Sequence, residues 1–435
     1  MKRNKAYKVD TNGKFYNVDW GIFQDDTTPG NFDGEGSKEN PYIIMSIEDL
    51  CYFSMQSNNG ENYSNKYIIL GKNLDFKSEL SYCNSSTTLY NEYFEVSDKN
   101  ISLFEILTNE KYNGFKPINR FSGYFSGEGY SISNVYINDS NDTGGLVRYL
   151  DGKIEKITLN GNIKGNGYVG GIAGIGKGEI QECNWNGKIE NISQQENYQG
   201  TGGILGGSTG SLSINKCISN GNISSLRNTG GILGYNVSGD NVIDSCVNNA
   251  SINSQKGSSG GIVGINGDKI INSYNTGNII SEGQDGSAGG IAGYNCNNII
   301  NCYNSGTING GVAGGIVGYF YFRTSSIINS YNCGDVKMHS NKNGGIIIGN
   351  IYPISTHVSL INSYGCTNSI DAILINSGAE HAEGNFFQIS NENLHSHEND
   401  GLLEKLNDYV EKNNNENKLI YWNFGKEDIP TLDIK

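Results

Sequence analysis

The sequence predicts an all-β protein, a right-handed parallel β-helix (β-solenoid) with short helical caps at both ends. The first observation behind this prediction is a glycine pair followed by Leu, Ile or Val-rich sequence, which recurs 25 to 32 residues apart. Its eight copies start at Gly144, Gly170, Gly202, Gly230, Gly260, Gly289, Gly314 and Gly344. Repeats of this length are typical of solenoids, propellers and other arrays.

The second observation is a phrase inside each repeat, such as NSYNTGNI from Asn272 and NCYNSGTI from Asn301. Short isoleucine-rich segments between Gly and Asn turns predict strands. One repeat is too small to bury its own apolar residues, but stacked copies can do so, with about 4.8 Å between rungs. A propeller needs longer blades of four strands, so the repeats favour the solenoid. An apolar residue precedes the Cys or Ser of each copy by three positions: Ile180, Ile214, Ile243, Ile270, Ile299, Ile327 and Leu360.

The facing of these side chains follows from residues that exchange within one column. Strict alternation along a strand would place Ile270 and Ser273 on opposite faces. Four cysteines and three serines share the Ser273 position, and we expect these small side chains to lie inside at a tight corner, with a bend after the isoleucine. The column consists of Cys183, Cys217, Cys246, Ser273, Cys302, Ser330 and Ser363.

The cysteines are expected to be packed thiols. The chain has nine, an odd number, and serine replaces cysteine freely in the column, which argues against a disulfide framework. Cys333 and Cys366 share another column with Thr276 and Ser305 and are interpreted in the same way. A buried free cysteine behaves as a small apolar residue.

Three regions are expected along the chain: residues 1–140 as an N-terminal cap with the first coils, 141–370 as the repeat solenoid, and 371–435 as a C-terminal cap. Ser46 and Asp49 predict the start of a helix that runs to about Ser57 and covers the open end of the first coil. Residues 78–113 break the pattern and are expected to form an insertion.

In the C-terminal region, residues 371–399 are expected to be irregular. An amphipathic helix is predicted over residues 401–412 with Asp400 as its cap, and a final strand over residues 419–424. Gly401, in this cap region, is expected to accept a side chain far more easily than the glycines of the repeats.

The GGIAG, GGILG and GGIVG phrases resemble the GLUG motif. The segment from Gly34 to Phe76, the segment from Phe115 to Ile137 and the closing GLLEKLNDYVEKNN resemble the flanks of GLUG-repeat bacterial surface proteins. The resemblance covers most of the chain. It implies a β-solenoid used as an exported adhesin, a stalk or a module attached to an enzyme. Some IgA-cleaving metallopeptidases carry such repeats, but their zinc signature HExxH is absent from this sequence.

Charge and hydropathy limit the partners. A net charge of −14 argues against nucleic acid and anionic membrane surfaces as partners. We expect no membrane insertion, because no apolar run of membrane-spanning length occurs. No secretory signal is visible after the basic start MKRNKAYKVD. Together with the resemblance, these features favour an extracellular or cell-surface location, with cytoplasmic location left open.

A column of aromatic and amide residues is the predicted binding site. On the outside of the coils, stacked tyrosines and asparagines could grip sugar rings or a partner protein. The alternative is that the same stacking only stabilises the coils, and Ile218 and Val247 at the tyrosine position suggest an inward column. The residues are Tyr274, Tyr303, Tyr331, Tyr364, Asn275, Asn304 and Asn332.

The enzyme alternative is a polysaccharide lyase or hydrolase built on the same scaffold. Such enzymes need clustered carboxylates on adjacent coils. Glu179, Asp240 and Asp268 take similar positions, but a repeat with serine there interrupts them. His395 and His397 have only a generic spacing for a metal. We therefore predict no catalytic residue, no metal and no cofactor.

The sequence as a whole favours a non-catalytic bacterial surface adhesin, stalk or interaction module. Its rigid solenoid would present side-chain columns and loops to a glycan or to a host or partner protein.

Overall fold

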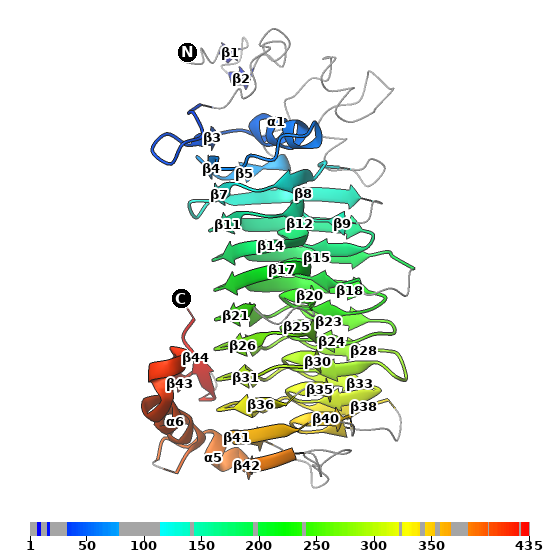
Figure 1. Cartoon of the computed structure of the whole chain (residues 1–435), viewed down its shortest axis with the longest axis vertical. Coiled ribbons are helices and arrows are strands. Elements are labelled where there is room, and N and C mark those ends of the chain that lie inside the picture. Colours follow the sequence, from blue (N-terminus) through cyan, green and yellow to red (C-terminus); the bar gives the residue numbers. More distant parts are fainter. Residues whose placement is uncertain are drawn as a thin grey trace.

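The structure, a computed structural model of the 435-residue chain, is a column of stacked parallel coils with a helix at one end and a folded segment along one side (Figure 1). Strands of successive coils pair in parallel throughout the solenoid, which confirms the predicted parallel β-solenoid. The structure describes residues 7–9, 15–17, 33–77, 114–139, 143–194, 199–236, 241–321, 324–339, 344–352, 357–366, 382–398, 400–425 and 428–434. The predicted insertion over residues 78–113 lies outside them.

The first strand column of each coil follows the glycine pair, and the second follows a short turn. β14 and β17 run through both columns. The first column is β6 (Ile118–Phe121), β10 (Val147–Leu150), β14 (Ala173–Gln181), β17 (Leu205–Asn215), β20 (Leu233–Tyr235), β25 (Val263–Asn266), β30 (Ala292–Asn295), β35 (Val317–Phe320) and β40 (Ile348–Ile351). The second adds β7 (Tyr124–Ser126), β11 (Lys153–Glu155), β21 (Val242–Asp244), β26 (Lys269–Ile271), β31 (Ile299–Ile300), β36 (Ser325–Ile328), β41 (Val358–Cys366) and β42 (Ala382–Ile389).

The third column changes character along the solenoid. Its early strands are long and its later ones are split in two. They are β8 (Ser131–Asp139), β12 (Thr158–Gly165), β15 (Asn184–Asn191), β18 (Ile218–Ser225), then β22 (Val247–Asn248) with β23 (Ser251–Ser254), β27 (Tyr274–Asn275) with β28 (Ile279–Ser281), β32 (Tyr303–Asn304) with β33 (Ile308–Gly310), and β37 (Tyr331–Asn332) with β38 (Val336–Met338).

The glycine pairs form a fourth column, a separate eight-stranded sheet. Its strands are β9 (Thr143–Gly144), β13 (Tyr168–Gly170), β16 (Thr201–Gly202), β19 (Thr229–Gly230), β24 (Ser259–Gly260), β29 (Ser287–Gly289), β34 (Val312–Gly314) and β39 (Gly344–Gly345).

A left-handed residue makes the bend between the second and third columns. At this corner φ lies between 48° and 57° in eight successive coils. The isoleucine before the bend and the cysteine or serine after it are both buried, so both point inward as predicted. The left-handed residues are Lys156, Glu182, Lys216, Ser245, Asn272, Asn301, Asn329 and Asn362.

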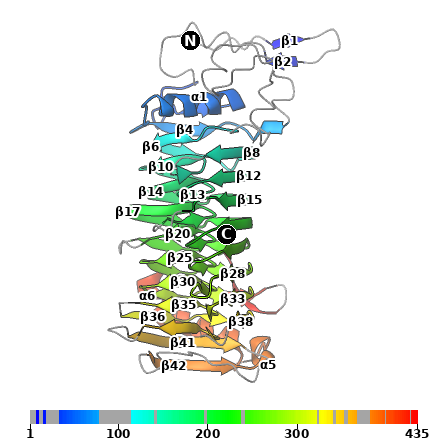
Figure 2. The same ribbon diagram turned by 90° about the vertical axis from the view of Figure 1, so that its right-hand side faces the viewer.

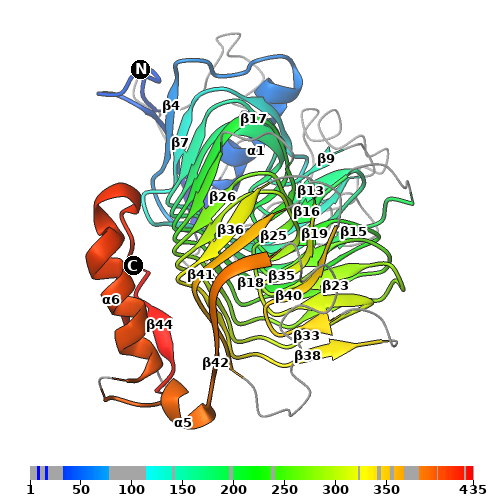
Figure 3. The same cartoon turned by 60° about the horizontal axis from the view of Figure 1, so that its bottom comes forward.

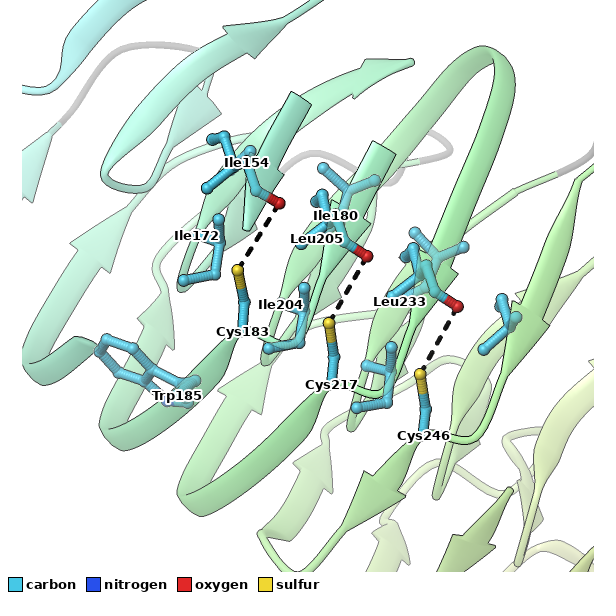
Figure 4. Packing of buried hydrophobic residues seen from close by; sticks show 14 of the residues in the cluster. Ile154, Ile172, Ile180, Cys183, Trp185, Ile204, Leu205, Cys217, Leu233 and Cys246 are labelled. Carbon is cyan, nitrogen blue, oxygen red and sulfur yellow. Dashed lines mark hydrogen bonds between the residues drawn. The ribbon is translucent and has the colours of Figure 1, made fainter. Parts of the chain in front are cut away.

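The buried cysteine column explains why serine can replace cysteine. The thiols of Cys183, Cys217 and Cys246 each reach the isoleucine carbonyl of the preceding coil, at 3.7 to 3.8 Å (Figure 4). Each thiol also lies near the carbonyl two residues before it, as in Cys246 to Asp244 at 3.3 Å. The Ser273 hydroxyl donates to the equivalent carbonyl, that of Ile271, at 2.7 Å. Either side chain therefore fills the same space and satisfies the same backbone group.

The glycine pairs are required by crowding rather than by a positive φ. A Cβ on Gly261 would lie 2.0 Å from the Gly290 carbonyl oxygen of the next coil and 2.4 Å from the Asn275 side chain. A Cβ on Gly171 would lie 2.7 Å from the buried Trp185 ring. The second glycine leaves room for the interior side chain of the third column in six of the pairs, those with Gly171, Gly203, Gly231, Gly261, Gly290 and Gly315.

Helix α1 (Ile47–Asn58) closes the N-terminal end of the solenoid (Figure 2). Its predicted cap is confirmed, because the Ser46 hydroxyl accepts from the Asp49 amide at 3.1 Å and the Asp49 carboxylate accepts from the Met45 amide at 2.9 Å. The helix lies on β6, and β3 (Tyr42–Ile44) pairs with β4 (Tyr67–Leu70), which is followed by β5 (Leu74–Asp75). A short antiparallel pair, β1 (Tyr7–Val9) and β2 (Phe15–Asn17), precedes these elements.

The C-terminal region differs from the expectation in three respects. Within the expected irregular segment, β42 pairs with β41 as a last rung, and α5 (Asn391–Leu394) follows it. Helix α6 (Leu402–Asn417) has Gly401, not Asp400, as its N-cap residue, with no side-chain cap. The helix and the antiparallel pair β43 (Trp422–Phe424) and β44 (Pro430–Leu432) lie beside the second strand column instead of stacking on the last coil (Figure 3). We call residues 402–434 the lateral segment.

Candidate binding surface

Three of the predicted tyrosines form a stack on the outer side of the third column, and the fourth follows in register. The rings of Tyr274 and Tyr303 have centroids 4.7 Å apart, and those of Tyr303 and Tyr331 are 5.3 Å apart, with interplanar angles of 16° and 6°. Tyr364 pairs in register with Tyr331 and stacks on Phe387 of the last rung, with centroids 5.6 Å apart. The structure therefore brings the four predicted tyrosines together.

The lateral segment covers this stack. The Trp422 ring lies across Tyr303 and Tyr331, with centroid distances of 5.8 and 5.5 Å. The Tyr303 hydroxyl hydrogen-bonds the Thr431 hydroxyl at 2.6 Å, and the Tyr331 hydroxyl donates to the Pro430 carbonyl. As a result Tyr331 is fully buried and Tyr303 is 5% exposed.

The left-handed corner asparagines hold the same segment. The Asn272 carboxamide oxygen accepts from the Ile420 amide at 3.0 Å. The Asn301 carboxamide donates to the Ile420 carbonyl at 2.9 Å and accepts from the Trp422 indole N–H at 2.7 Å. Further along the corner, Asn329 and Asn362 donate to the carbonyls of Leu406 and Lys405, both at 3.2 Å.

These asparagines also bond one another along the solenoid. The amide of Asn301 donates to Asn272 at 2.7 Å, that of Asn329 to Asn301 at 2.8 Å, and that of Asn362 to Asn329 at 2.6 Å. A carboxamide carries both donors and acceptors, so one side chain can serve the ladder and the docked segment together.

The three predicted asparagines of the site point inward. Asn275, Asn304 and Asn332 are fully buried, and successive carboxamides are joined by N–H to oxygen bonds of 2.7 Å. Each amide also bonds the backbone carbonyl two residues further on, at 2.8 to 3.0 Å. The expected outward amide ladder is thus wrong in its facing, because the bend turns this position into the core.

Of the predicted site, Tyr274 is the one residue left partly exposed. The other three tyrosines contact the lateral segment or the last rung, and Tyr364 keeps only 4% of its surface exposed. Burial raises the pKa of Tyr303 and of Tyr331, so both phenols stay protonated and remain donors at neutral pH. In this structure the column serves as an internal docking face.

A second group of tyrosines, missed by the sequence analysis, lies on the outer side of the first strand column. The rings of Tyr294 and Tyr319 are stacked with centroids 5.2 Å apart and an interplanar angle of 8°. Tyr321 contacts Tyr294 at 5.3 Å, and Tyr352 contacts Tyr321 at 4.8 Å. The sequence signal for two of them was an aromatic residue directly after a glycine phrase, Tyr294 after GGIAG and Tyr319 after GGIVG. We call these four residues the surface tyrosine cluster.

Two of the three carboxylates of the enzyme alternative, Glu179 and Asp268, are not brought together in the structure. Glu179 is outward and pairs with Lys153 at 2.8 Å, while the buried Asp268 accepts from the Asn241 side chain at 2.9 Å. Asp240 lies outside the described residues. Glu179 and Asp268 therefore face opposite sides of the coil wall.

A different carboxylate, Glu155, lies in a charged network on the first coils. The Tyr124 hydroxyl donates to it at 2.5 Å, and Lys153 pairs with it at 3.1 Å. Burial alone would raise the pKa of Glu155, but these two partners outweigh it and lower the pKa. A carboxylate held ionised is a poor general acid, so the network suits a structural role.

The described part of the chain contains no group of three His, Cys, Asp or Glu residues able to hold a metal ion. His397 instead lies against the Phe424 ring, with centroids 3.9 Å apart. A third histidine of the C-terminal region, His381, lies outside the described residues.

The fold and these columns define the chain as a β-solenoid repeat protein. No family model matches it. The chain is 27% identical over 186 residues to a protein named Halomucin from Haloquadratum walsbyi, which is 40% of this chain and 2% of that protein. Among solved structures, a candidate immunoglobulin A1 protease from Bacteroides ovatus is similar at 18% identity and a TM-score of 0.40, over 92% of this chain and 95% of that one. In the residues that the structure describes, no helix has both the length and the hydropathy to cross a membrane.

Proposed function

We propose that the chain is a non-catalytic interaction module of the GLUG-repeat type, a rigid solenoid that acts at a bacterial surface as an adhesin or stalk. The observation that carries this proposal is that the lateral face of the solenoid already holds a folded polypeptide segment through repeated columns. Stacked tyrosines give apolar contact, and corner asparagines give hydrogen bonds at regular spacing.

The physical basis is that a solenoid repeats the surface side chains of one coil on each of the following coils. Like residues recur about 4.8 Å apart along its axis, so a single favourable side chain becomes a stripe. The continuous buried core of isoleucines, from Ile154 to Ile327, keeps those stripes in register. A rigid surface loses little conformational entropy when a partner binds.

The extracellular setting is supported by the GGIxG phrases and their resemblance to GLUG-repeat surface proteins. The thiols are compatible with it, because the described cysteines form no disulfide and most are buried in the core, away from oxidants. The ionised state of Glu155 and the separated faces of Glu179 and Asp268 favour a binding role over a hydrolase or lyase.

The test is to incubate the purified chain with a glycan array and with immobilised mucin and collagen, and in parallel with a panel of polysaccharides for product release. Saturable binding without product release is expected. Release of oligosaccharides would replace the proposal with the carbohydrate-active enzyme, and absence of binding to every surface would overturn it.

A further inference from the structure

The surface tyrosine cluster is a concentration of aromatic residues that the lateral segment leaves untouched. Tyr294 and Tyr319 take equivalent positions in neighbouring strands of the first column, and Tyr321 and Tyr352 follow the ends of β35 and β40. All four are partly exposed. The lateral segment bonds to the left-handed corner and the Tyr303 stack, which lie beyond the second column in each coil.

The rings of the cluster have two orientations. The rings of Tyr294 and Tyr319 are nearly parallel and stack along the solenoid axis. The Tyr321 ring is inclined by 53° to Tyr294 and by 47° to Tyr319, and the Tyr352 ring is inclined by 60° to Tyr321. The cluster thus offers both ring edges with hydroxyls and inclined ring faces.

The described surroundings of the cluster are mixed. Asn298 and Ser326 are neighbours beside the second column, and Asn350 follows Tyr319 in register on the next coil. On the preceding coil Ile265 is in register with Tyr294, and β26 begins with Lys269. The chain as a whole carries a net charge of −14. Burial, together with Tyr321 and Tyr319, raises the pKa of Tyr294, so its hydroxyl remains a neutral donor.

We infer that the surface tyrosine cluster is a binding site for a neutral polysaccharide. This inference rests on the proposed function and names its site. A pyranose ring has an apolar face of C–H groups and a rim of hydroxyls, and tyrosine matches both with its ring and its phenol. The net charge of −14 disfavours an acidic polysaccharide, so a neutral one suits this chain.

A protein partner is the other occupant that an aromatic patch could have. A stable protein interface needs roughly 800 Å² on each side and a core of large apolar side chains. The cluster spans three neighbouring coils and is bordered by Ile265, in register with Tyr294, on one side and by Asn350, in register with Tyr319, on the other. Its small size favours a sugar chain.

The experiment is affinity electrophoresis of the full chain in gels that contain soluble xyloglucan, galactomannan or β-1,3-glucan, with polygalacturonate as the charged contrast. At least one neutral polysaccharide is expected to retard the parent chain. Tyr319→Ala should weaken that retardation about tenfold or more, since it removes the ring that is stacked on Tyr294 and inclined to Tyr321. Tyr321→Ala, outside any strand, should act in the same direction.

The matched control is Tyr421→Ala, which removes a tyrosine that is 49% exposed but lies in the lateral segment. It should bind as the parent does, and thermal melts of all variants show whether the solenoid is intact. The inference is overturned if polygalacturonate alone retards the parent chain or if no polysaccharide does. It is also overturned if both cluster variants are retarded as strongly as the parent. If polysaccharide binding persists in both variants, the proposed function stands and only its site is wrong; if nothing binds on any surface, the function itself fails.

Discussion

The coils of residues 143–236 and those of residues 241–366 share one backbone but present different chemistry at the same corner. The left-handed residue is Lys156, Glu182 or Lys216 in the first group, and asparagine in four coils of the second, from Asn272 to Asn362. Lys156 and Lys216 extend into solvent, whereas the asparagines bond one another and hold the lateral segment. The backbone fixes where a partner could dock, and the side chain at one position decides whether it does.

The interior of the third column changes in the same direction. Leu159 and Trp185 fill it in the first group, and Asn248, Asn275, Asn304 and Asn332 fill it in the second. A buried carboxamide ladder is stable when each member is fully hydrogen-bonded and costly when one is missing. The second group of coils therefore depends on register more strictly than the first.

The largest expected effect is that of Gly261→Val in the second group. Its Cβ would fall 2.0 Å from the Gly290 carbonyl and 2.4 Å from Asn275, so the neighbouring coil and the interior ladder must both move. We expect the free energy of unfolding to fall by about 3 kcal/mol or more. Chemical denaturation of parent and variant measures it.

Gly210→Val in the first group is the control, because its nearest neighbour would be the flexible Lys177 side chain at 3.6 Å. It should cost about 1 kcal/mol or less. Gly401 is unsuitable as a control, contrary to expectation, since its Cβ would lie 2.4 Å from the Ser396 carbonyl. Equal melting of Gly261→Val and the parent would mean that the coils unfold as independent units.

A somewhat smaller effect is expected for Asn304→Ala. The change removes bonds to Asn275, Asn332 and the Gly306 backbone, and it leaves buried polar groups without partners. We expect a loss of about 3 kcal/mol in the free energy of unfolding. Ser219→Ala is the matched control in the first group, since Ser219 occupies the same interior column and its buried hydroxyl has no hydrogen-bond partner. If both variants lose the same stability, the ladder adds nothing beyond packing.

The third prediction concerns the lateral segment alone. Trp422→Ala removes a buried ring from Tyr303 and Tyr331 and a bond to Asn301. The segment should dock more weakly by about 3 kcal/mol, while the solenoid melts almost as before. Hydrogen exchange and limited proteolysis should become faster over residues 402–434.

Tyr421→Ala is the neighbouring control and should leave that exchange unchanged, because Tyr421 is 49% exposed. Cooperative loss of the whole solenoid in Trp422→Ala would show that the segment is part of one folding unit with the coils of the second group.

The sequence predicted the solenoid and the inward cysteine column, because residues that recur at one position of the repeat contact one another in successive coils. The helix from Ser46 was predicted from its capping residues. Ile270 lies on Ile243 and Ile299 for the same reason that the three occupy one column of the sequence. The bend after the isoleucine was also predictable, since only a bend lets Ile270 and Ser273 both point inward.

The candidate site could not be predicted in the same way. Whether Tyr303 and Tyr331 face water depends on Trp422 and Pro430, about a hundred residues away and outside the periodic region. The inward facing of Asn304 depends on the left-handed φ of Asn301, which a polar sequence pattern conceals. The repeat pattern predicts contacts between equivalent residues of successive coils. It carries no information about a segment that docks at a single place and is not repeated.

The smallest expected effect concerns the reactivity of the thiols. It distinguishes a buried cysteine from partly exposed ones within the second group of coils. Burial raises the pKa of the Cys302 thiol to about 12, well above its usual range. The Cys302 thiol should therefore resist thiol reagents at pH 8, whereas the partly exposed Cys296 and Cys333 react first. Mass spectrometry of the alkylated peptides distinguishes them, and labelling of Cys302 at the rate of Cys296 without denaturant would contradict its inward facing.

The same pKa sets the sign of the pH dependence. Between about pH 9 and pH 12 the unfolded chain releases the Cys302 proton while the folded chain keeps it, so this thiol makes the free energy of unfolding fall as pH rises. Cys302→Ser should fold normally, because Ser273 and Ser330 occupy the same column in adjacent coils and each bonds the carbonyl two residues before it. Without the thiol, the variant should lose less stability than the parent between pH 8 and pH 10.5. Denaturant titrations at the two pH values measure this difference, and parallel slopes for parent and variant would show that the Cys302 thiol titrates alike in the folded and unfolded chain.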